Sequence, residues 1–253
     1  MINYVSSSNS GYLKFAKIAI ENFIKKFDKS DILHFQCLDK EIYNELSEMI
    51  KEKDTNNIIL YESDTKSPSG PQIFNSPGFI KITKEKFEFL HSILSGMNEN
   101  EILHFFDADV YFFKSPEEEI NKMMSELDIC FQQDAPITDN HLIAETYVCS
   151  GNFSIKKTEE SIRFIEKITQ KLNPSQNEQE VIYEYLRDNC PINDVRTYKL
   201  AKISVYDPEL FQNGFDAFRS GWYLNNEKVC VHANHMVGVQ SKIDAFNTMG
   251  ISI

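Results

Sequence analysis

The chain has 253 residues, of which 42% are hydrophobic and 25% are charged, and its formal net charge is −12. This length suits one large domain, and no Gly/Ser/Pro linker separates two self-sufficient halves, so we predict a single domain over residues 1–253. An acidic chain without a basic cluster is unsuited to nucleic-acid binding, because phosphate binding depends on lysine and arginine.

Cysteine usage and the N-terminal sequence indicate a compartment. The five cysteines are an odd number without a CxxC pair, which argues against a structural zinc site and against a disulfide framework. We interpret them as reduced, mostly buried thiols. The first residues, MINYVSSSNSGY, lack the basic and apolar parts of a signal peptide, and no apolar run is long enough to span a bilayer. We therefore expect a cytoplasmic protein that does not span a membrane.

The N-terminal region predicts a strand, a loop and a helix. Residues 2–5 form an apolar strand, a small polar loop covers residues 6–11, and apolar residues recur at helical spacing from Tyr12 to Phe27. In α/β folds this succession opens a nucleotide-binding crevice. The loop contains neither GxGxxG nor a Walker lysine, so two common phosphate-binding motifs are absent.

The alternation of strands and helices continues to residue 61. We predict a strand over residues 32–37, a helix that is capped by Asp39 and runs to about Lys53, and a strand over residues 58–61. Residues 62–78 break this pattern with several prolines and glycines. Long loops in compact domains tend to be functional or mobile, so we consider a lid or an acceptor-binding loop against a merely tolerated insertion.

The stretch ILHFFDADVYFF, residues 102–113, is the strongest local signal. A helix marked by Phe87 and Met97 leads into it, and we predict one extended strand that carries Asp107 and Asp109. Side chains at i and i+2 of a strand point the same way, so both carboxylates can face one point. Buried carboxylates repel each other unless a cation meets them, and a hard divalent ion suits such a pair.

The second half of the chain continues the alternation. Expected elements are a helix starting at Pro116, strands over residues 129–132 and 147–155, a helix capped by Thr158 that reaches Leu172, a helix over residues 177–186, and a strand over residues 229–231. This order predicts an α/β fold with a mainly parallel sheet flanked by helices. His232 follows the last strand directly, where an imidazole is either a third ligand to the ion or a hydrogen-bonded core histidine.

Three interpretations of the Asp107 and Asp109 pair stay open at this point. The pair can be a turn after a core strand, because D-x-D is short and aspartate is common in turns. It can be the first motif of a haloacid-dehalogenase-type phosphotransferase, although that motif usually lies near the N-terminus and no later Gly-Asp motif completes such a site here. It can also be the metal site of a glycosyltransferase that binds a sugar nucleotide.

Five stretches together resemble the nucleotide-diphospho-sugar transferase family, retaining glycosyltransferases of the GT-A fold. They are NYVSSSNSGY, KFEFLHSIL, FFDADVYFFKSP, CSGNFSIKKTEES and VHANHMVGVQSKIDAF, which follow the family's order and cover most of the chain. The resemblance implies a single GT-A domain in two parts. Residues 1–115 would bind the nucleotide sugar and end in the DxD motif, and residues 116–253 would bind the acceptor and complete the metal site.

The resemblance also implies roles for individual residues. Asp109 would bind Mn²⁺ or Mg²⁺ directly, Asp107 would contact the ribose, the ion or both, and His232 would be the third metal ligand. His235 stands where the family usually has tryptophan, and we favour His232 as the ligand. The other implied donor-binding residues are Ser6, Ser8 and Asn9 at the base and ribose, Lys86 at the nucleotide or phosphates, Ser150 and Gly151 beside the donor sugar, and Gly238 and Lys242 at the diphosphate.

The chemistry that the resemblance implies centres on Glu178 and Gln179. They match an Asp-Gln pair of related retaining enzymes, in which the glutamine lies near the anomeric carbon, so the catalytic residues would be Gln179, Glu178 and Asp109. Asp134 or Asp139 could orient the acceptor. The implied reaction moves a sugar from a nucleotide diphosphate, with UDP favoured, to a glycan, protein or lipid-linked acceptor that the sequence does not identify. The rival hypothesis is a non-catalytic sugar-nucleotide binder, which the departures from the family pattern support.

Overall fold

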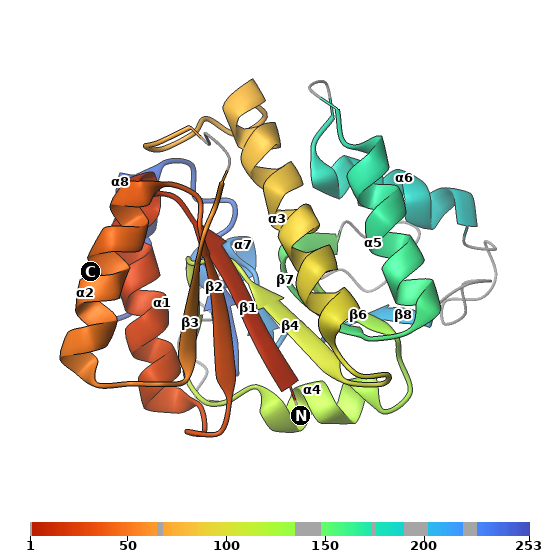
Figure 1. The fold of residues 1–253 in the computed structure, drawn as a ribbon, viewed down its shortest axis with the longest axis horizontal. Coiled ribbons are helices and arrows are strands. Elements are labelled where there is room, and N and C mark those ends of the chain that lie inside the picture. The colour runs from red at the N-terminus through yellow and green to blue at the C-terminus, as the bar shows by residue number, and fades with distance from the viewer. Residues whose placement is uncertain (1, 65–67, 135–147, 174–175, 190–201, 220–226) are drawn as a thin grey trace.

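The computed structural model describes residues 2–64, 68–134, 148–173, 176–189, 202–219 and 227–253. Within them a seven-stranded sheet, in the order β3-β2-β1-β4-β7-β6-β8, forms the centre of the molecule (Figure 1). Its strands are β1 (Ile2–Ser8), β2 (Ile32–Cys37), β3 (Ile58–Glu62), β4 (Ile102–Phe106), β6 (Ile129–Gln133), β7 (Val148–Lys156) and β8 (Ile203–Val205).

The strand directions agree with the prediction of a mainly parallel sheet. Strands β1 to β4 run parallel to one another, and β8 runs parallel to β6. The exception is β7, which is antiparallel to both β4 and β6. Because β1, β2 and β4 are parallel, the loops that follow them gather at one edge of the sheet, where α/β proteins bind ligands.

Helices cover both faces of the sheet (Figure 1). They are α1 (Leu13–Lys26), α2 (Lys40–Lys53), α3 (Pro77–Gly96), α4 (Glu117–Met124), α5 (Glu159–Lys171), α6 (Glu178–Asn189), α7 (Gly214–Arg219) and α8 (Val239–Thr248), with a short 3₁₀ helix at Ser10–Tyr12. Helices α1 and α2 bury side chains such as Phe15 and Ile42 in one core, and α3 and α5 bury Phe87 and Ile165 in another. Burial of these apolar faces is the main stabilisation of the helices.

Side-chain caps fix where two of the predicted helices begin. Asp39 Oδ1 accepts a hydrogen bond from Ile42 N at 3.0 Å, and Thr158 Oγ1 accepts one from Ser161 N at 3.1 Å. Such bonds satisfy backbone donors that have no partner within the helix. Both predicted caps are confirmed, and α4 begins directly after Pro116.

Helix α3 begins earlier than the sequence pattern predicted. Its first residue is Pro77, and Ser76 Oγ accepts a hydrogen bond from Phe79 N at 3.2 Å, well ahead of Phe87. A proline is compatible with the first helical turn, because its missing N–H would have no intrahelical partner there. The proline-rich composition of residues 62–78 therefore concealed a helix start.

The prediction of one extended strand over residues 102–113 is wrong. Strand β4 ends at Phe106, and a turn in which Val110 N donates to Asp107 O at 3.0 Å leads out of the main sheet. A second sheet consists of β5 (Val110–Phe112), β10 (Cys230–His232) and β9 (Phe211–Gln212). Aspartate favours turns, and pairing with β10 draws β5 away from β4. The two carboxylates therefore lie on a turn.

The structure tests the predictions about thiols and membrane spans only over the described residues. The described cysteines, Cys37, Cys130, Cys149 and Cys230, are buried and form no disulfide. Among the described residues no helix is both long and apolar enough to cross a bilayer. Asp139, Tyr147 at the start of a predicted strand, and Cys190 lie outside the described residues.

His104, in the middle of β4, is fully buried among aromatic rings. Its Nδ1 lies 2.8 Å from Ser154 Oγ, and the centres of the Tyr4 and Phe112 rings are 5.9 Å and 6.1 Å from its own. Burial lowers the pKa of His104 from its usual 6.5 to about 3. The folded protein therefore keeps this ring neutral at pH values where the unfolded chain binds a proton.

We expect the free energy of unfolding to fall as the pH drops below about 6.5, because protonation of His104 then favours the unfolded chain. The loss from this group approaches about 1.4 kcal/mol per pH unit and ends near the folded-state pKa. Urea unfolding at about pH 7.5 and pH 5 should show a contribution of about 2 kcal/mol. His104→Phe should flatten this slope. An unchanged slope in His104→Phe would contradict the assignment.

Candidate functional site

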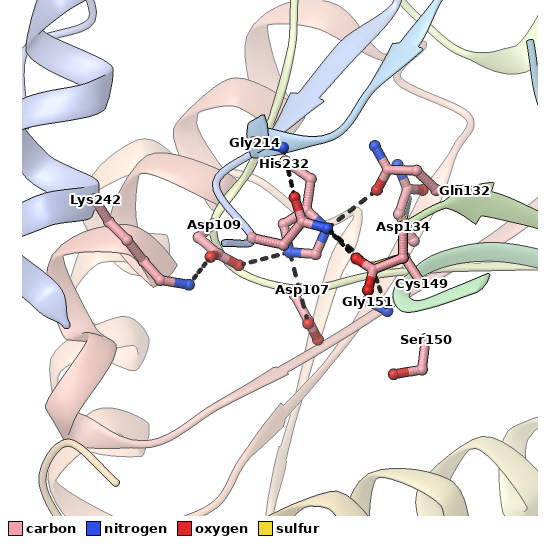
Figure 2. Close-up of polar contacts among 12 residues, drawn as sticks. Asp107, Asp109, Gln132, Asp134, Cys149, Ser150, Gly151, Gly214, His232 and Lys242 are labelled. Carbon is pink, nitrogen blue, oxygen red and sulfur yellow. Dashed lines mark hydrogen bonds and ion pairs between the residues drawn. The ribbon is translucent and has the colours of Figure 1, made fainter. Parts of the chain in front are cut away.

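Three side chains from two distant parts of the chain meet at the carboxyl end of β4 (Figure 2). Asp107 and Asp109 lie on the turn between β4 and β5, and His232 ends β10. His232 Nε2 lies 3.3 Å from Asp109 Oδ1 and 3.9 Å from Asp107 Oδ2. One ligand atom from each residue lies within 4.8 Å of the other two. Two carboxylates and an imidazole at this spacing form a possible site for a divalent cation.

Backbone hydrogen bonds bring these side chains together. Strands β5 and β10 pair in antiparallel fashion, and Ala233 N donates to Asp109 O at 3.1 Å. Asp107 N donates to Gly151 O at 2.7 Å, which ties the turn to β7. The two carboxylates do not need the alternating side-chain directions of an extended strand to lie close together. The strand pairing and the bond from Asp107 N to Gly151 O set their positions.

Gly151 leaves the space in which the cluster forms. A Cβ atom there would lie 2.3 Å from Asp107 Oδ2 and 2.4 Å from His232 Cε1, closer than real contacts allow. Only a residue without a side chain lets β7 approach the possible ligands this closely. Carboxylates crowded around such a space are stable when a positive group faces them, so the donor set fits a cation.

Lys242 of α8 is one cationic partner of the turn. Its ammonium group forms an ion pair with Asp109 Oδ2 and lies 5.6 Å from the centre of the Tyr12 ring. Burial opposes the charge of Asp109, but Lys242 and His232 outweigh it and hold the pKa of this carboxyl well below its usual range. Burial likewise opposes the charge of Lys242, and Asp109 outweighs it, so the pKa of Lys242 is raised. The pair therefore stays charged.

Lys86 of α3 is a second cationic partner and is almost fully buried. Its Nζ lies 3.7 Å from Asp107 Oδ1 and 3.7 Å from Glu178 Oε1, and it donates to Ser150 O at 3.4 Å. Burial alone would lower the pKa of Lys86, but Asp107 and Glu178 outweigh burial and raise it. Lys86 thus joins the turn, β7 and the start of α6 in one charged cluster.

Glu178 and Gln179 face different partners at the start of α6. Glu178 is buried, and its Oε1 accepts a hydrogen bond from Ser150 Oγ at 2.9 Å. Its Oε2 has no hydrogen-bond partner in the described part of the chain. Gln179 Nε2 donates to Asp134 Oδ2 at 2.8 Å and to Val148 O at 3.3 Å. Glu178 therefore joins the Lys86 cluster, whereas the Gln179 amide is directed to the end of β6.

His235 contacts Asp134 instead of the two aspartates of the turn. Its Nε2 lies 2.8 Å from Asp134 O and 3.3 Å from Asp134 Oδ1. Asn234 Nδ2 donates to Asp134 Oδ1 at 2.6 Å. Burial would raise the pKa of Asp134, but His235 and Gln179 outweigh it and lower the pKa. His232 and not His235 lies in the group that could hold a metal ion, and Asp134 links the segment after β10 to α6.

A pocket opens beside the cluster, between the loop after β1, α3 and α8. Its predicted lining residues are Ser8, Asn9, Lys86, Asp107, Asp109, Glu178 and Lys242. Sequence reasoning missed other lining residues, among them Tyr12, Gln72, Phe79 and Thr83. Phe79, Thr83 and Lys86 follow the i, i+4, i+7 spacing of one helix face, so an earlier start of α3 would have revealed two of them.

Four predicted donor-binding residues lie outside this lining: Ser6, Ser150, Gly151 and Gly238. Ser6 is fully buried within β1. Gly238 is exposed, has a φ of 89°, and its O accepts a hydrogen bond from Lys242 N at 3.4 Å. Gly238 therefore begins the helical turn that carries Lys242, and a positive φ is readily adopted by glycine.

The described part of the proline-rich segment packs directly on the loop after β1. Asn9 Nδ2 donates to Pro68 O at 3.0 Å and to Gly70 O at 2.8 Å. A Cβ atom at Gly11 would lie 2.1 Å from Pro71 N, so the two backbones touch there. This segment contributes Gln72 to the pocket lining and is held by the two hydrogen bonds from Asn9.

An acidic turn at the end of a parallel strand, the buried Lys86, the mostly buried Lys242 and a pocket at the first β–α loop lie where α/β folds bind their ligands. The chain belongs to the nucleotide-diphospho-sugar transferase family, whose sequence model matches residues 33–246. None of the curated proteins matches the sequence significantly. The protein is therefore a glycosyltransferase that uses a nucleotide-sugar donor, and the family match leaves the phosphotransferase interpretation without support.

Solved structures of the galactosyltransferase LgtC share this fold. The complex of LgtC with donor and acceptor sugar analogs matches with a TM-score of 0.58 and 11% identity, over 92% of this chain and 87% of its own. Another LgtC structure is that of an active-site mutant in which glutamate replaces glutamine.

Two further glycosyltransferases match over almost the whole chain. One is involved in the glycosylation of the major capsid of PBCV-1 and matches with a TM-score of 0.55 and 13% identity, over 98% of both chains. The other, mouse xyloside xylosyltransferase 1, matches with a TM-score of 0.54 and 10% identity, over 94% of this chain and 100% of its own. These matches confirm the predicted GT-A fold.

Proposed function

We propose that this protein is a metal-dependent, retaining glycosyltransferase, with UDP favoured as the carrier of the donor sugar. The observation that carries the proposal is the convergence of Asp107, Asp109 and His232 between the buried Lys86 and the mostly buried Lys242, beside the pocket at the first β–α loop. These three residues would hold Mn²⁺ or Mg²⁺, and the bound ion would act as a Lewis acid toward the charge that develops on the leaving diphosphate.

The lining of the pocket supports a nucleotide site at the loop after β1. Ser8 and Asn9 line it with polar groups, Ser6 lies deeper in the same strand, and Tyr12 adds an aromatic wall. Lys242 lies at the Asp109 side of this pocket, where its ammonium group can meet the diphosphate as a point charge. Gly238 begins the turn of α8 that presents Lys242.

We assign the donor sugar to the space between β7 and the start of α6. Gly151 and Ser150 take little space there. Glu178 Oε2, a buried oxygen without a hydrogen-bond partner in the described part of the chain, can accept a bond from a sugar hydroxyl. Lys86 holds Glu178 in this position through its ion pair with Oε1.

Gln179 is our candidate for the group that supports the anomeric carbon. Its Nε2 donates to Asp134 and Val148, so Oε1 is the atom that would support the positive charge of the sugar ring. The active-site glutamine of LgtC supports a glutamine in this role. The acceptor hydroxyl attacks from the leaving-group side: its oxygen bonds to the anomeric carbon as the bond to the diphosphate breaks, and a diphosphate oxygen takes the proton. This route needs no separate protein base.

The acceptor side is assigned to the wall formed by the proline-rich segment. Ile73 and Phe74 are exposed there at 80% and 57%, next to the pocket-lining Gln72. Asp134, which with Asp139 was one of two residues that could orient the acceptor, accepts a hydrogen bond from Gln179, so we assign it to the positioning of that glutamine. A glycan, a protein or a lipid-linked sugar stays the predicted acceptor. The cytoplasmic location also stays a prediction.

In this proposal both predicted parts of the domain contribute residues to the site. Residues 1–115 supply Lys86 and the two aspartates, and residues 116–253 supply His232 and Lys242. A single domain over residues 1–253 is the simplest arrangement in which one site draws on both parts.

A non-catalytic sugar-nucleotide binder is the second candidate function. Its support is the departure from the family pattern at Glu178 and His235. Such a binder would bind the donor with a divalent cation but would not transfer the sugar, and it would not hydrolyse the donor even slowly. A transferase hydrolyses the donor slowly when no acceptor is present. Donor hydrolysis followed over hours separates the two.

Nucleotide binding is expected to depend on a divalent cation. In a thermal-shift panel of nucleoside diphosphates and nucleotide sugars, UDP compounds should raise the melting temperature with Mn²⁺ and not with a chelator. A ligand at about 100 times its Kd stabilises the folded state by about 2.7 kcal/mol. For a chain of this size that is a shift of roughly 5–10 °C. A shift with inorganic phosphate or metal alone, and none with any nucleotide, would reject the proposed function.

A further inference from the structure

The side chain of Gln132, near the end of β6, has a fixed orientation. It is fully buried, and its Nε2 donates to Phe211 O at 3.2 Å and to Gln212 O at 2.8 Å. Both amide hydrogens are thus used by backbone carbonyls of β9. Rotation of the amide by half a turn would place its oxygen against these two acceptors, so the oxygen must point the other way.

The oxygen of Gln132 meets the far side of the possible metal ligand His232 (Figure 2). Gln132 Oε1 lies 3.1 Å from His232 Nδ1, and the opposite ring nitrogen, Nε2, faces the two aspartates of the turn. An amide oxygen can only accept a hydrogen bond, so Nδ1 must carry the proton. In a neutral imidazole that proton leaves the lone pair on Nε2, the nitrogen that a cation needs.

Cys149 is the other neighbour of His232 Nδ1, with its Sγ at 3.4 Å. The sulfur accepts from Gly151 N at 3.4 Å and from Asn234 Nδ2 at 3.7 Å. A thiol is a weak donor, and this one is surrounded by donors. It does not compete with Gln132 for control of the ring.

We propose that Gln132 is a positioning residue, which holds His232 in the tautomer with the proton on Nδ1 and directs the Nε2 lone pair at the cation site. The inference rests on the proposed metal-dependent function. Partners of this kind fix the orientation of a metal-binding histidine and raise its basicity, and their loss typically weakens metal binding by about 10–100-fold. Gln132 is not expected to touch the substrate.

Gln132 also has a structural role, and the test must separate this role from the positioning of His232. Its bonds to Phe211 and Gln212 anchor β9, which pairs with the strand that carries His232. Loss of the amide N–H groups therefore lowers stability whatever the role of the oxygen. The replacement Gln132→Met removes both functions, whereas Gln132→Glu keeps an acceptor oxygen for Nδ1 and loses the bonds to β9, because a carboxylate has no N–H to donate.

The test measures Mn²⁺ affinity of the full chain by electron paramagnetic resonance, together with urea unfolding. Gln132→Met should bind Mn²⁺ about 10–100-fold more weakly than wild type, and Gln132→Glu should stay close to wild type although both variants are less stable. Cys149→Ala, which removes the other neighbour of Nδ1, should also keep wild-type affinity. Pulsed spectra of bound Mn²⁺ should show coupling to an imidazole nitrogen in wild type and lose it in Gln132→Met.

Two results overturn the inference while the proposed function stands: wild-type Mn²⁺ affinity in Gln132→Met, or equal losses in Gln132→Met and Gln132→Glu. If Gln132→Met does not fold, Gln132→Glu decides alone, because a loss of tenfold or more with the acceptor in place contradicts the tautomer role. Failure of the proposed metal site looks different, since the wild-type protein itself would then bind no Mn²⁺ or show no nitrogen coupling.

Discussion

Asp109→Asn is expected to lower kcat/KM for donor turnover by about 1000-fold, because the variant loses half of the negative charge that faces a bound cation. The amide keeps the shape of the side chain but cannot balance both His232 and Lys242, which face the two oxygens of Asp109. Lys242 is then left without its carboxylate in a mostly buried position. We therefore also expect a loss of about 1–3 kcal/mol in the free energy of unfolding.

Hydrolysis of the donor identified by thermal shift, measured over a range of Mn²⁺ concentrations, checks this expectation. Circular dichroism shows whether the variant is folded at the assay temperature. Asp244→Asn, at an exposed position of the same helix as Lys242, is the matched control and should keep wild-type rates. Near-normal turnover of Asp109→Asn at saturating Mn²⁺ would show that Asp109 does not serve a metal.

Lys86→Met is expected to reduce the free energy of unfolding by about 3–5 kcal/mol, because it leaves a buried carboxylate without its cation. Glu178 bears most of this cost, since its side chain is only 5% exposed. Asp107, with 35% of its side chain exposed, can recover hydration from solvent. The methionine fills most of the space of the lysine stem, so the loss reports on charge more than on packing.

The double variant Lys86→Met/Glu178→Gln should recover more than half of that loss, because no unpaired charge then stays in the cluster. Urea unfolding of wild type, both single variants and the double variant gives the coupling energy between the two side chains. Lys84→Met, on a half-exposed position of α3, should change stability by less than about 1 kcal/mol. A coupling near zero would mean that Lys86 and Glu178 are hydrated in solution.

Local sequence patterns were sufficient for most of the main sheet. Residues 2–5, 32–37 and 58–61 were predicted as strands and form β1 to β3, because a parallel sheet covered on both faces needs continuous apolar runs. The same logic failed over residues 102–113, which form two strands in two sheets. An apolar run does not show which partner a strand will pair with, and the pairing of β5 with β10 joins residues that are far apart in the chain.

The candidate site shows the same division between local chemistry and distant contacts. From the sequence alone one obtains the residue types, two carboxylates after an apolar run and a histidine after another, and their chemistry points to a cation. Only the three-dimensional structure shows that Glu178 forms an ion pair with Lys86, whereas Gln179 forms a hydrogen bond with Asp134.

The partner of His232 illustrates why. Gln132 and His232 are 100 residues apart, and a glutamine within an apolar strand carries no local signal of the hydrogen bond that it will make. Periodicity reports which face of an element is buried, whereas hydrogen bonds and ion pairs depend on atomic positions set by strand pairing and close approach. The sequence by itself therefore indicates the chemistry of the site, whereas the geometry of the site arises from long-range packing.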